Sequence, residues 1–382
     1  MLVVGRDTRI SSALRSRLGI ALLFVAAGLA YGGWAVSIAG VKVALGLSDG
    51  ALGAALLCVA AGAMVAMPVM GWLGANGARW LMTAAGLALV VVLPLPGVVG
   101  GVVALGGVLL LVGAAAGSLD VGMNARASRF EQDSGRAVMS SFHAAFSLGG
   151  LLGTVLVAGA EAAGAGVRGG LLLAAAAVCG CVLAHAWLDA KPAMGSAEAG
   201  GRVGWPGRAL VGIGGLCLLA FLTEGAVADW SGVFMRDVAE VVGPMKALGF
   251  GAFSAAMIVA RLFGDHWVRR FGARVVLQAG AVAAAVGVAL AMAWPAAGAV
   301  GFGLVGLGVA NVAPILFSAA GKAGPAASTG IAAVATLGYA GMLVGPPIIG
   351  GVAEVSGLRI ALGVLVVAMG VIAAAAARVV RA

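Results

Sequence analysis

Twelve continuous apolar runs, most of them about 20 residues long, constrain this chain more than any other feature of its sequence. The run at 171–188, LLLAAAAVCGCVLAHAWL, is typical and contains no Asp, Glu, Lys or Arg. A helix needs about 20 apolar residues to span a bilayer, whereas the strands of an outer-membrane barrel alternate apolar with polar residues. With 62% apolar and 10% charged residues, the chain also exceeds what a soluble fold buries. The sequence therefore predicts an all-α membrane protein.

The runs form two sets of six, separated by the polar stretch DAKPAMGSAEAGGRVGWPGR. We expect an N-terminal six-helix bundle at 1–188, a cytoplasmic linker at 189–208 and a C-terminal six-helix bundle at 209–382. The first run is too long for the core of a signal peptide, so we expect it to remain as a spanning helix. The expected helices lie near 18–40, 50–72, 80–95, 101–123, 138–160, 168–188, 209–233, 246–267, 274–294, 297–320, 328–352 and 358–377.

Basic residues are distributed unevenly between the two sides that this arrangement defines. With both termini in the cytoplasm, 17 Lys and Arg residues lie inside and 5 lie outside, while Arg261 lies within a helix. Cytoplasmic loops of membrane proteins carry an excess of Lys and Arg. We therefore expect a multi-pass protein of the bacterial inner membrane with both termini cytoplasmic. The net charge of +9 comes from these short clusters and not from a basic domain, so we expect no nucleic-acid partner.

Weak internal similarity relates the two halves of the chain. Gly117 and Asp120 of the fourth run match Gly308 and Asn311 of the tenth, 191 residues further on. Three more matches occur in the same order along both halves at nearly the same offset. Residues 77–79 match 272–274, and residues 147–149 match 336–338. An acid followed by an Arg occurs at 161 and 168 in the first half and at 354 and 359 in the second. This pattern predicts two pseudo-symmetric six-helix halves. Glycine, with 65 of 382 residues, predicts that the helices pack closely.

The loops after the second and eighth runs carry related motifs. The first is Gly71-Trp-Leu-Gly-Ala-Asn-Gly-Ala-Arg79, and the second runs from Arg261 through Asp265 to Arg274. Both resemble the G-x-L-x-D-R-x-G-R-R loop of the major facilitator superfamily, although the first lacks the Asp and one Arg. The resemblance covers nearly the whole chain and implies that the halves alternate between conformations held by a latch. The latch residues that it implies are Gly71, Arg79, Arg261, Asp265, Arg269, Gly272 and Arg274, with an i,i+4 ion pair between Arg261 and Asp265.

Three further stretches are similar to a bacterial branch near the fucose-permease-like and sugar-transporter-like members. They are LDVGMN from Leu119, SFHAAFSLGG from Ser141, and EGAVADW from Glu224; Gly345-Pro-Pro fits the same group. The resemblance implies a secondary transporter for a small polar or neutral solute such as a sugar. The fourth helix lacks the Arg-bearing motif of proton-linked drug exporters, which lowers the case for drug export without excluding it.

Ionisable side chains within apolar runs are candidates for function, because they are expensive in lipid. Asp120 and His143 lie at similar depths, about 9–10 Å from the cytoplasmic boundary, on consecutive runs. They can meet, with Asn124 as a third member, either as a proton-coupling or substrate-binding group or as a structural hydrogen bond. Glu224 lies deeper, in the seventh run, with no Lys or Arg near it on its own helix. We expect it to couple protons or contact substrate.

Other polar residues are candidates for the central site or for its boundary. Asn311 occupies the repeat position of Asp120, and the only two tyrosines are Tyr31 and Tyr339. Asn311 and the two tyrosines can line a midplane cavity. Asp229 is expected to cap its helix or to pair with Arg236 or Lys246. Trp34 and Trp230 are expected to anchor at the membrane interface.

Motifs of other protein classes are missing from the sequence. It has no phosphate-binding loop, metalloprotease motif or nucleophile elbow, and His143, His185 and His266 are too scattered for a metal site. We therefore expect no enzyme activity, no metal and no cofactor, and a monomer whose partners are a small solute, protons and the lipid bilayer. Two alternatives remain open at this point: an exporter of amphipathic compounds, and a sensor or scaffold that keeps the fold without transport.

Overall fold

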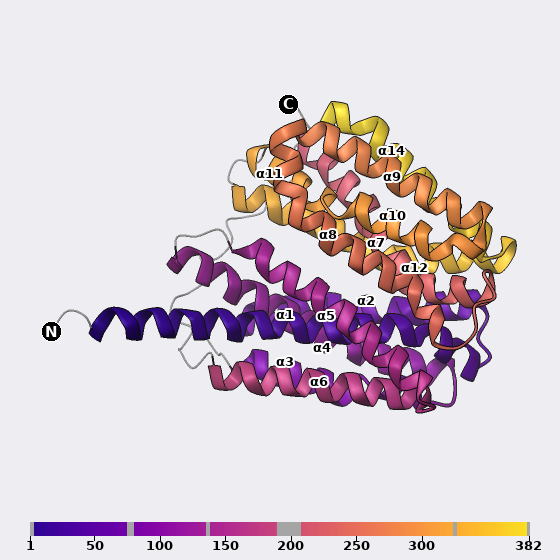
Figure 1. Ribbon diagram of the computed structural model, residues 1–382, viewed down its shortest axis with the longest axis horizontal. Helices are drawn as coiled ribbons and strands as arrows, with labels where there is room; N and C mark the ends of the chain where they lie inside the picture. Colours follow the sequence, from indigo (N-terminus) through magenta and orange to yellow (C-terminus); the bar gives the residue numbers. More distant parts are fainter. Residues whose placement is uncertain (1–3, 75–79, 135–137, 189–207, 324–326, 380–382) are drawn as a thin grey trace. The chain divides into compact units, whose positions relative to one another are not determined.

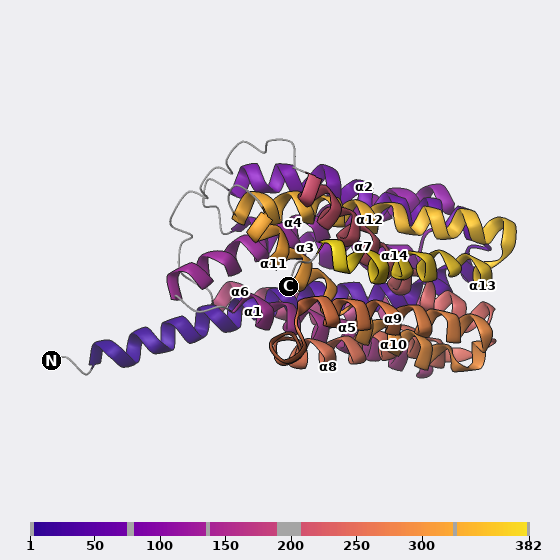
Figure 2. The same cartoon turned by 90° about the horizontal axis from the view of Figure 1, so that it is seen from above.

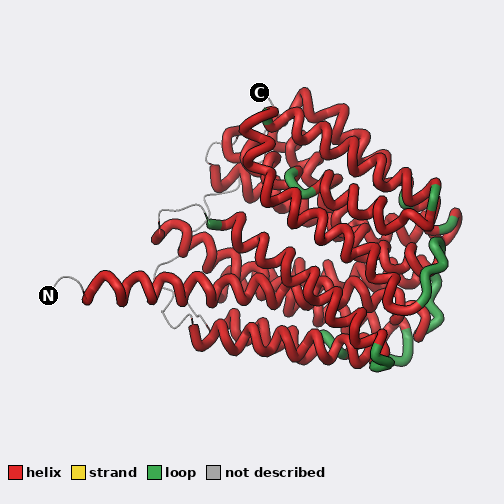
Figure 3. Tube along the Cα trace, viewed as in Figure 1, coloured by secondary structure: helices red, strands yellow, loops and turns green. Residues whose placement is uncertain are grey.

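The computed structural model of the chain is built from helices joined by short loops (Figure 1 and Figure 3). It describes residues 4–74, 80–134, 138–188, 208–323 and 327–379, and these residues contain no strand. Among them, twelve helical segments are long and apolar enough to cross a membrane. The predicted all-α membrane fold with twelve spans is therefore confirmed. Most of the expected linker, 189–207, lies outside the described residues.

The first six spans are formed by single long helices, and η1 (Leu95–Gly97) extends the third. Their bounds are α1 (Val4–Ala44), α2 (Asp49–Gly74), α3 (Trp80–Val92), α4 (Val102–Ser134), α5 (Met139–Ala162) and α6 (Gly166–Leu188).

The next six spans include two that are divided. The tenth consists of α10 and α11, and the twelfth of α13 and α14. The bounds are α7 (Arg208–Asp237), α8 (Leu248–Phe271), α9 (Ala273–Ala293), α10 (Gly298–Val309), α11 (Val312–Ala323), α12 (Ala327–Ser356), α13 (Leu358–Ala361) and α14 (Gly363–Val379). The short helices η2 (Gly243–Ala247) and η3 (Pro295–Ala297) precede α8 and α10.

The chain divides into two compact units. The first comprises Met1–Trp34, Cys58–Gly100 and Ala104–Ala197, and the second comprises Ala35–Leu57, Gly101–Val103 and Glu198–Ala382. The last turns of α1 and the first turns of α2 therefore pack within the second unit, beside helices that follow much later in the sequence.

Within the first unit, glycines bring helix backbones into direct contact. A Cβ atom added to Gly28 of α1 would lie 2.1 Å from the carbonyl oxygen of Phe146 on α5. Where α2 crosses α4, a Cβ on Gly62 would lie 1.9 Å from the Leu110 oxygen, and one on Gly113 would lie 1.7 Å from the Val59 oxygen. No side chain larger than hydrogen fits at these distances, so the close packing predicted from the glycine content is confirmed.

Glycines also bring helix backbones into direct contact within the second unit. The helices α9 and α10 lie side by side in both views (Figure 1 and Figure 2). Added Cβ atoms would lie 2.4 Å from the Gly308 oxygen at Gly280 and 2.5 Å from the Gly301 oxygen at Gly287. On the neighbouring pair α7 and α12, a Cβ on Gly341 would lie 2.1 Å from the Leu218 oxygen. Such contacts fix which face of each helix is buried, and thereby which polar residues face the interior.

Candidate functional site

An acid and a base from different helices meet inside the second unit. Glu224 lies on α7, and its Oε1 is 4.0 Å from an Nη2 of Arg261 on α8. Both side chains are mostly buried, with 21% and 22% of their surface exposed. An isolated charge is costly inside a membrane span, so the two opposite charges lie close together.

The same arginine contacts an interruption in the tenth span. Helix α10 ends at Val309 and α11 begins at Val312, so Ala310 and Asn311 form a turn between them. Arg261 donates from Nε to the Ala310 carbonyl oxygen at 3.5 Å. Backbone groups released by a broken helix need partners inside a membrane, and the guanidinium supplies one. Broken spans of this kind often line the solute sites of transporters.

Asn311 anchors the interruption to α8. It donates from Nδ2 to the Ala260 carbonyl oxygen at 3.2 Å, and its residue surface is 9% exposed. A Cβ on Gly264 of α8 would lie 2.0 Å from the Asn311 Oδ1. Asn311 therefore mainly joins α8 to the turn between α10 and α11, beside the Glu224–Arg261 pair.

A cluster of aromatic rings lies one turn from Glu224 along α7. Phe221 precedes Glu224 by three residues, so both lie on one face of α7. The Phe221 ring packs edge-on against Tyr339 of α12 and Phe317 of α11, with ring centroids 5.9 and 6.3 Å apart. Tyr339 stays 42% exposed despite these contacts. We name Glu224, Arg261, Phe221, Phe317 and Tyr339 the Glu224 site.

The candidates in the first unit make contacts within that unit. Asn124 donates from Nδ2 to the Asp120 Oδ1 at 3.0 Å and to the Asp120 carbonyl oxygen at 2.9 Å, so this predicted partnership is present. His143 packs edge-on against Phe24, with ring centroids 5.4 Å apart. Tyr31 packs against Phe146 at 5.7 Å. A contact between Asp120 and His143 stays a prediction.

The latch residues are placed only in part. Arg269 and Arg274 are exposed near the turn between α8 and α9, where Gly272 adopts a φ of +82° that favours glycine. Gly71 lies in the last turn of α2, whereas Arg79 and the side chain of Asp265 lie outside the described residues. Arg261 lies beside Glu224 of another helix, a pairing that spacing along one helix does not reveal.

Two tryptophans correct the sequence-based interpretation. Trp230 is fully buried and Trp34 is 7% exposed, so neither anchors at a membrane interface. Trp230 can be buried because the residue opposite it, Gly350, has no side chain. A Cβ on Gly350 would lie 3.2 Å from the indole Cζ2. Arg236, one of the two partners expected for Asp229, pairs with Asp237 at 2.7 Å, and the role of Asp229 stays a prediction.

A second charged cluster went unnoticed in the sequence. Lys42, at the end of α1, places its Nζ 2.6 Å from both the Asp49 Oδ1 and the Asp237 Oδ2. Arg236 donates to the Ala39 carbonyl oxygen at 3.0 Å, and Glu354 of α12 accepts from the Gly50 backbone N–H at 2.7 Å. We name Lys42, Asp49, Arg236, Asp237 and Glu354 the Lys42 cluster. The short spacing of Lys42 and Asp49 around one turn was the available signal.

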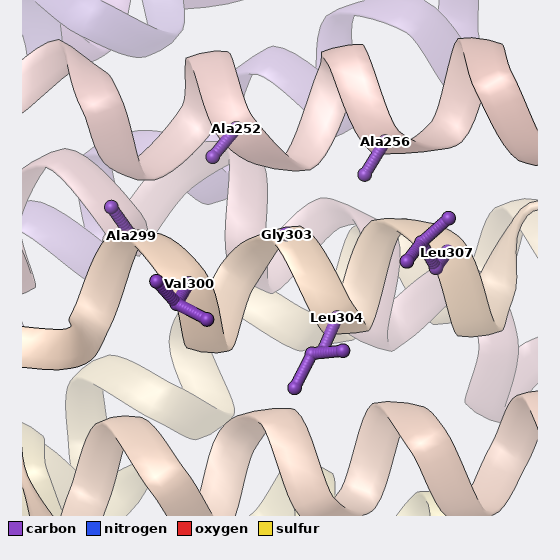
Figure 4. Close-up of a pocket in the computed structure, with 7 residues that line it drawn as sticks. All are labelled: Ala252, Ala256, Ala299, Val300, Gly303, Leu304 and Leu307. Atoms are coloured by element: carbon purple, nitrogen blue, oxygen red, sulfur yellow. The ribbon is translucent and has the colours of Figure 1, made fainter.

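One groove of about 350 Å³ lies between α8 and α10 (Figure 4). Its lining is wholly aliphatic: Ala252, Ala256, Ala299, Val300, Gly303, Leu304 and Leu307. With no polar side chain to orient a solute, the groove suits hydrocarbon and is distinct from the Glu224 site. Within the described part of the chain, no group of three His, Cys, Asp or Glu residues can hold a metal ion.

Twelve apolar spans with a paired acid and base at a broken helix define a polytopic membrane protein of the carrier class. Comparison with known proteins makes this specific. The chain is 36% identical over 364 residues to an uncharacterized MFS-type transporter of Yersinia pestis, with 94% of each chain covered. It is 33% identical over 368 residues to the membrane protein MosC of Rhizobium meliloti, covering 94% of this chain and 88% of MosC. The chain belongs to the major facilitator superfamily of membrane transporters.

Solved structures show the same fold at low sequence identity. A variant of the nucleoside transporter NupG superposes with a TM-score of 0.77 at 16% identity, covering 96% of this chain and all of that one. An inward-facing bacterial homologue of the human lysosomal transporter Spinster gives 0.74 at 13% identity, covering 95% and 96%. No protein-family model matches the chain. The Yersinia pestis relative and the two structural neighbours named here are transporters, and a position near the fucose-permease-like members stays a prediction.

Proposed function

We propose that this transporter is coupled to protons and moves a small polar solute with at most one charge, such as a sugar, by alternating access. The observation that supports this most is the Glu224–Arg261 pair at the α10–α11 break. Few ionisable groups lie within the spans, and in the described part of the chain this acid lies beside a base of another helix. At 4.0 Å the carboxylate lies at the outer limit of an ion pair with the guanidinium.

Proton uptake by Glu224 would change which interactions Arg261 makes. A protonated carboxyl attracts the guanidinium less strongly, so that Arg261 can direct a donor toward a polar solute atom. Solute binding and protonation then favour each other, which is the thermodynamic requirement for coupling. The Asp120–Asn124 pair, His143 and Tyr31 are the corresponding candidates in the first unit, and Asn311 and Tyr339 are the further candidates in the second.

The proposal also includes the orientation in the membrane, the two repeats, the latch and the oligomeric state. The excess of Lys and Arg supports cytoplasmic termini in the inner membrane, with the Lys42 cluster on the outer side. The sequence halves 1–188 and 209–382, joined by a linker, would be the two repeats. The turn at Gly272, with Arg269 and Arg274, would form the latch together with Gly71, Arg79 and Asp265, and the protein would act as a monomer.

Proteoliposomes with a pH-sensitive dye inside test the coupling. They are challenged with neutral sugars, amino acids, monocarboxylates and lipophilic cations, and solute-driven proton entry is recorded. The Glu224→Gln variant should fold but lose this signal, whereas the exposed Glu240→Gln should retain it. Proton entry that survives unchanged in Glu224→Gln would assign Glu224 a structural role and contradict the proposal.

A further inference from the structure

The segment of α1 that precedes its apolar run is basic. It contains a single acid, Asp7, and four arginines, which are Arg6, Arg9, Arg15 and Arg17. The 24 residues at 18–41 then contain no Asp, Glu, Lys or Arg. At about 1.5 Å per residue they cover about 36 Å, which is enough to cross the hydrocarbon core of a bilayer. Arg15 and Arg17 therefore lie at the level of the lipid headgroups.

Helix α1 continues through this level instead of ending in it. It has 41 residues, or about 62 Å of helix, whereas the hydrocarbon core is about 30 Å thick. Both views show its N-terminal turns continuing past the end of its neighbour α6 (Figure 1 and Figure 2). Residues 14–18 are thus part of a regular helix where α1 crosses the headgroup layer, and the helical repeat fixes the directions of their side chains.

The exposed face of α1 at this level carries an apolar strip between two cations. The helical repeat places Leu14 and Leu18 on one face, with Arg15 on one side of them and Arg17 on the other. Leu14 is 55% and Leu18 is 49% exposed, whereas Ser16 on the opposite face is buried. Both arginines are exposed. A molecule that lies on the leucines therefore has a guanidinium on either side.

Contacts with neighbouring helices orient the two arginines. The guanidinium carbon of Arg15 lies 5.1 Å from the ring centroid of Trp187 on α6. Arg17 donates from Nη2 to the Ser141 Oγ of α5 at 3.3 Å. The Trp187 side chain is itself 71% exposed, and exposed indoles are typical of the membrane–water interface. We name Leu14, Arg15, Arg17, Leu18 and Trp187 the Arg15 surface.

The acids near this surface are too few to cancel its charge. Asp7 precedes Arg15 by eight residues and Asp189 follows Trp187 by two; both carboxylates lie outside the described residues. If each of them neutralises one arginine, two of the four arginines of the segment still keep their charge. The contacts that the structure describes for Arg15 and Arg17 are with a ring and a hydroxyl group, which balance no charge.

We propose that the Arg15 surface binds an anionic phospholipid of the leaflet that surrounds the N-terminal end of α1. The lipid phosphate accepts hydrogen bonds from Arg15 and Arg17, and the acyl chains begin against Leu14 and Leu18. Arginine suits this role because its planar group donates two parallel hydrogen bonds to phosphate oxygens. The exposed leucines favour a lipid over a free phosphate, which gains nothing from apolar contact.

Competition between lipids tests the proposal. Full-length protein in a neutral maltoside detergent is titrated with phosphatidylglycerol and with phosphatidylcholine of the same acyl chains, and bound lipids are counted by native mass spectrometry. Phosphatidylglycerol should bind about 25-fold more tightly, from about fivefold for each of two basic residues at a membrane surface. Equal affinity for the two lipids would overturn the proposal. Inorganic phosphate should not displace the lipid, and displacement at similar concentrations would show that the surface recognises free phosphate instead.

Charge variants locate the site. Arg15→Gln and Arg17→Gln should each weaken the binding of phosphatidylglycerol about fivefold, and together about 25-fold. Arg270→Gln is the matched control, because Arg270 also lies over an exposed ring, that of Phe271, at 5.6 Å. This control should bind the lipid like the native protein. A loss as large as that of Arg15→Gln would indicate general attraction to basic residues and contradict a site on α1.

Apolar variants test the acyl-chain contact without changing any charge. Leu14→Ser combined with Leu18→Ser should weaken the binding of both lipids and keep the preference for phosphatidylglycerol. Trp187→Ala should weaken phosphatidylglycerol binding, and Trp187→Phe should restore most of it, since either ring can hold Arg15. All these side chains are exposed, so the variants should unfold at nearly the native Tm in phosphatidylcholine. Native lipid affinity in the leucine variant would refute the placement of the acyl chains on α1.

Discussion

The crossing of α2 and α4 gives the sharpest test of how the helices are held together. Replacing Gly113 by Ala places a Cβ 1.7 Å from the Val59 carbonyl oxygen, whereas real contacts of this kind essentially never fall below 3.0 Å. The helices must therefore separate by about 1.3 Å, since a backbone oxygen cannot rotate away. Overpacking of this kind costs about 1–3 kcal/mol. We expect a value near the upper end, because Gly62 and Gly117 lose contacts at the same crossing.

Thermal unfolding in detergent measures the effect, with a fall in Tm of about 3–4 °C. Gly107→Ala is the matched control on the same helix, because no atom lies within 4 Å of its added Cβ. That variant should leave Tm unchanged or raise it slightly, since Ala favours helix over Gly by about 1 kcal/mol. Equal Tm values for the two variants would refute the argument that backbone contact holds α2 against α4.

Three further changes follow from the described contacts. Lys42→Met removes the cation shared by two carboxylates and should cost about 2 kcal/mol, between the values for exposed and buried pairs; the loss in Tm should shrink in 1 M salt. Gly264→Ala drives a methyl group into Asn311 and should abolish transport with little change in the amount of folded protein, as measured by gel filtration and dye-monitored proton entry. Trp230→Ala should lower the free energy of unfolding by about 3–5 kcal/mol, as for a core aromatic residue, and Trp230→Phe should lower it clearly less. If both variants lose little Tm and lose it equally, Trp230 would instead be an interface residue.

The fold could be predicted because hydropathy is a local property. Each apolar run indicates a span by its own length, and the positions of charges set its ends. The break between α10 and α11 was not predicted, although the sequence carries a signal for it: Pro314 has no backbone N–H to donate to the Ala310 carbonyl oxygen. Only the neighbouring α8 shows why it is tolerated, through Arg261 and Ala260.

The candidate site could be predicted residue by residue but not as an assembly. Glu224 was singled out by depth, since an acid in the middle of an apolar run is conspicuous. Its partner Arg261 was assigned by resemblance to a latch, because spacing along one helix cannot reveal contacts between helices. The two tryptophans were assigned wrongly for the same reason. The sequence indicates how deep a residue lies along its helix, but it does not indicate the direction in which the side chain points.

Contacts made by backbone rather than by side chains have a kinetic consequence. Where Gly28 meets α5, or Gly280 meets α10, burial freezes no side-chain rotamers and interlocks no branched side chains. Such surfaces can shear past one another without repacking, in the manner of small sliding movements between helices. A glycine-lined carrier of this kind should therefore change conformation with a low activation enthalpy, and its transport rate should fall only gently on cooling.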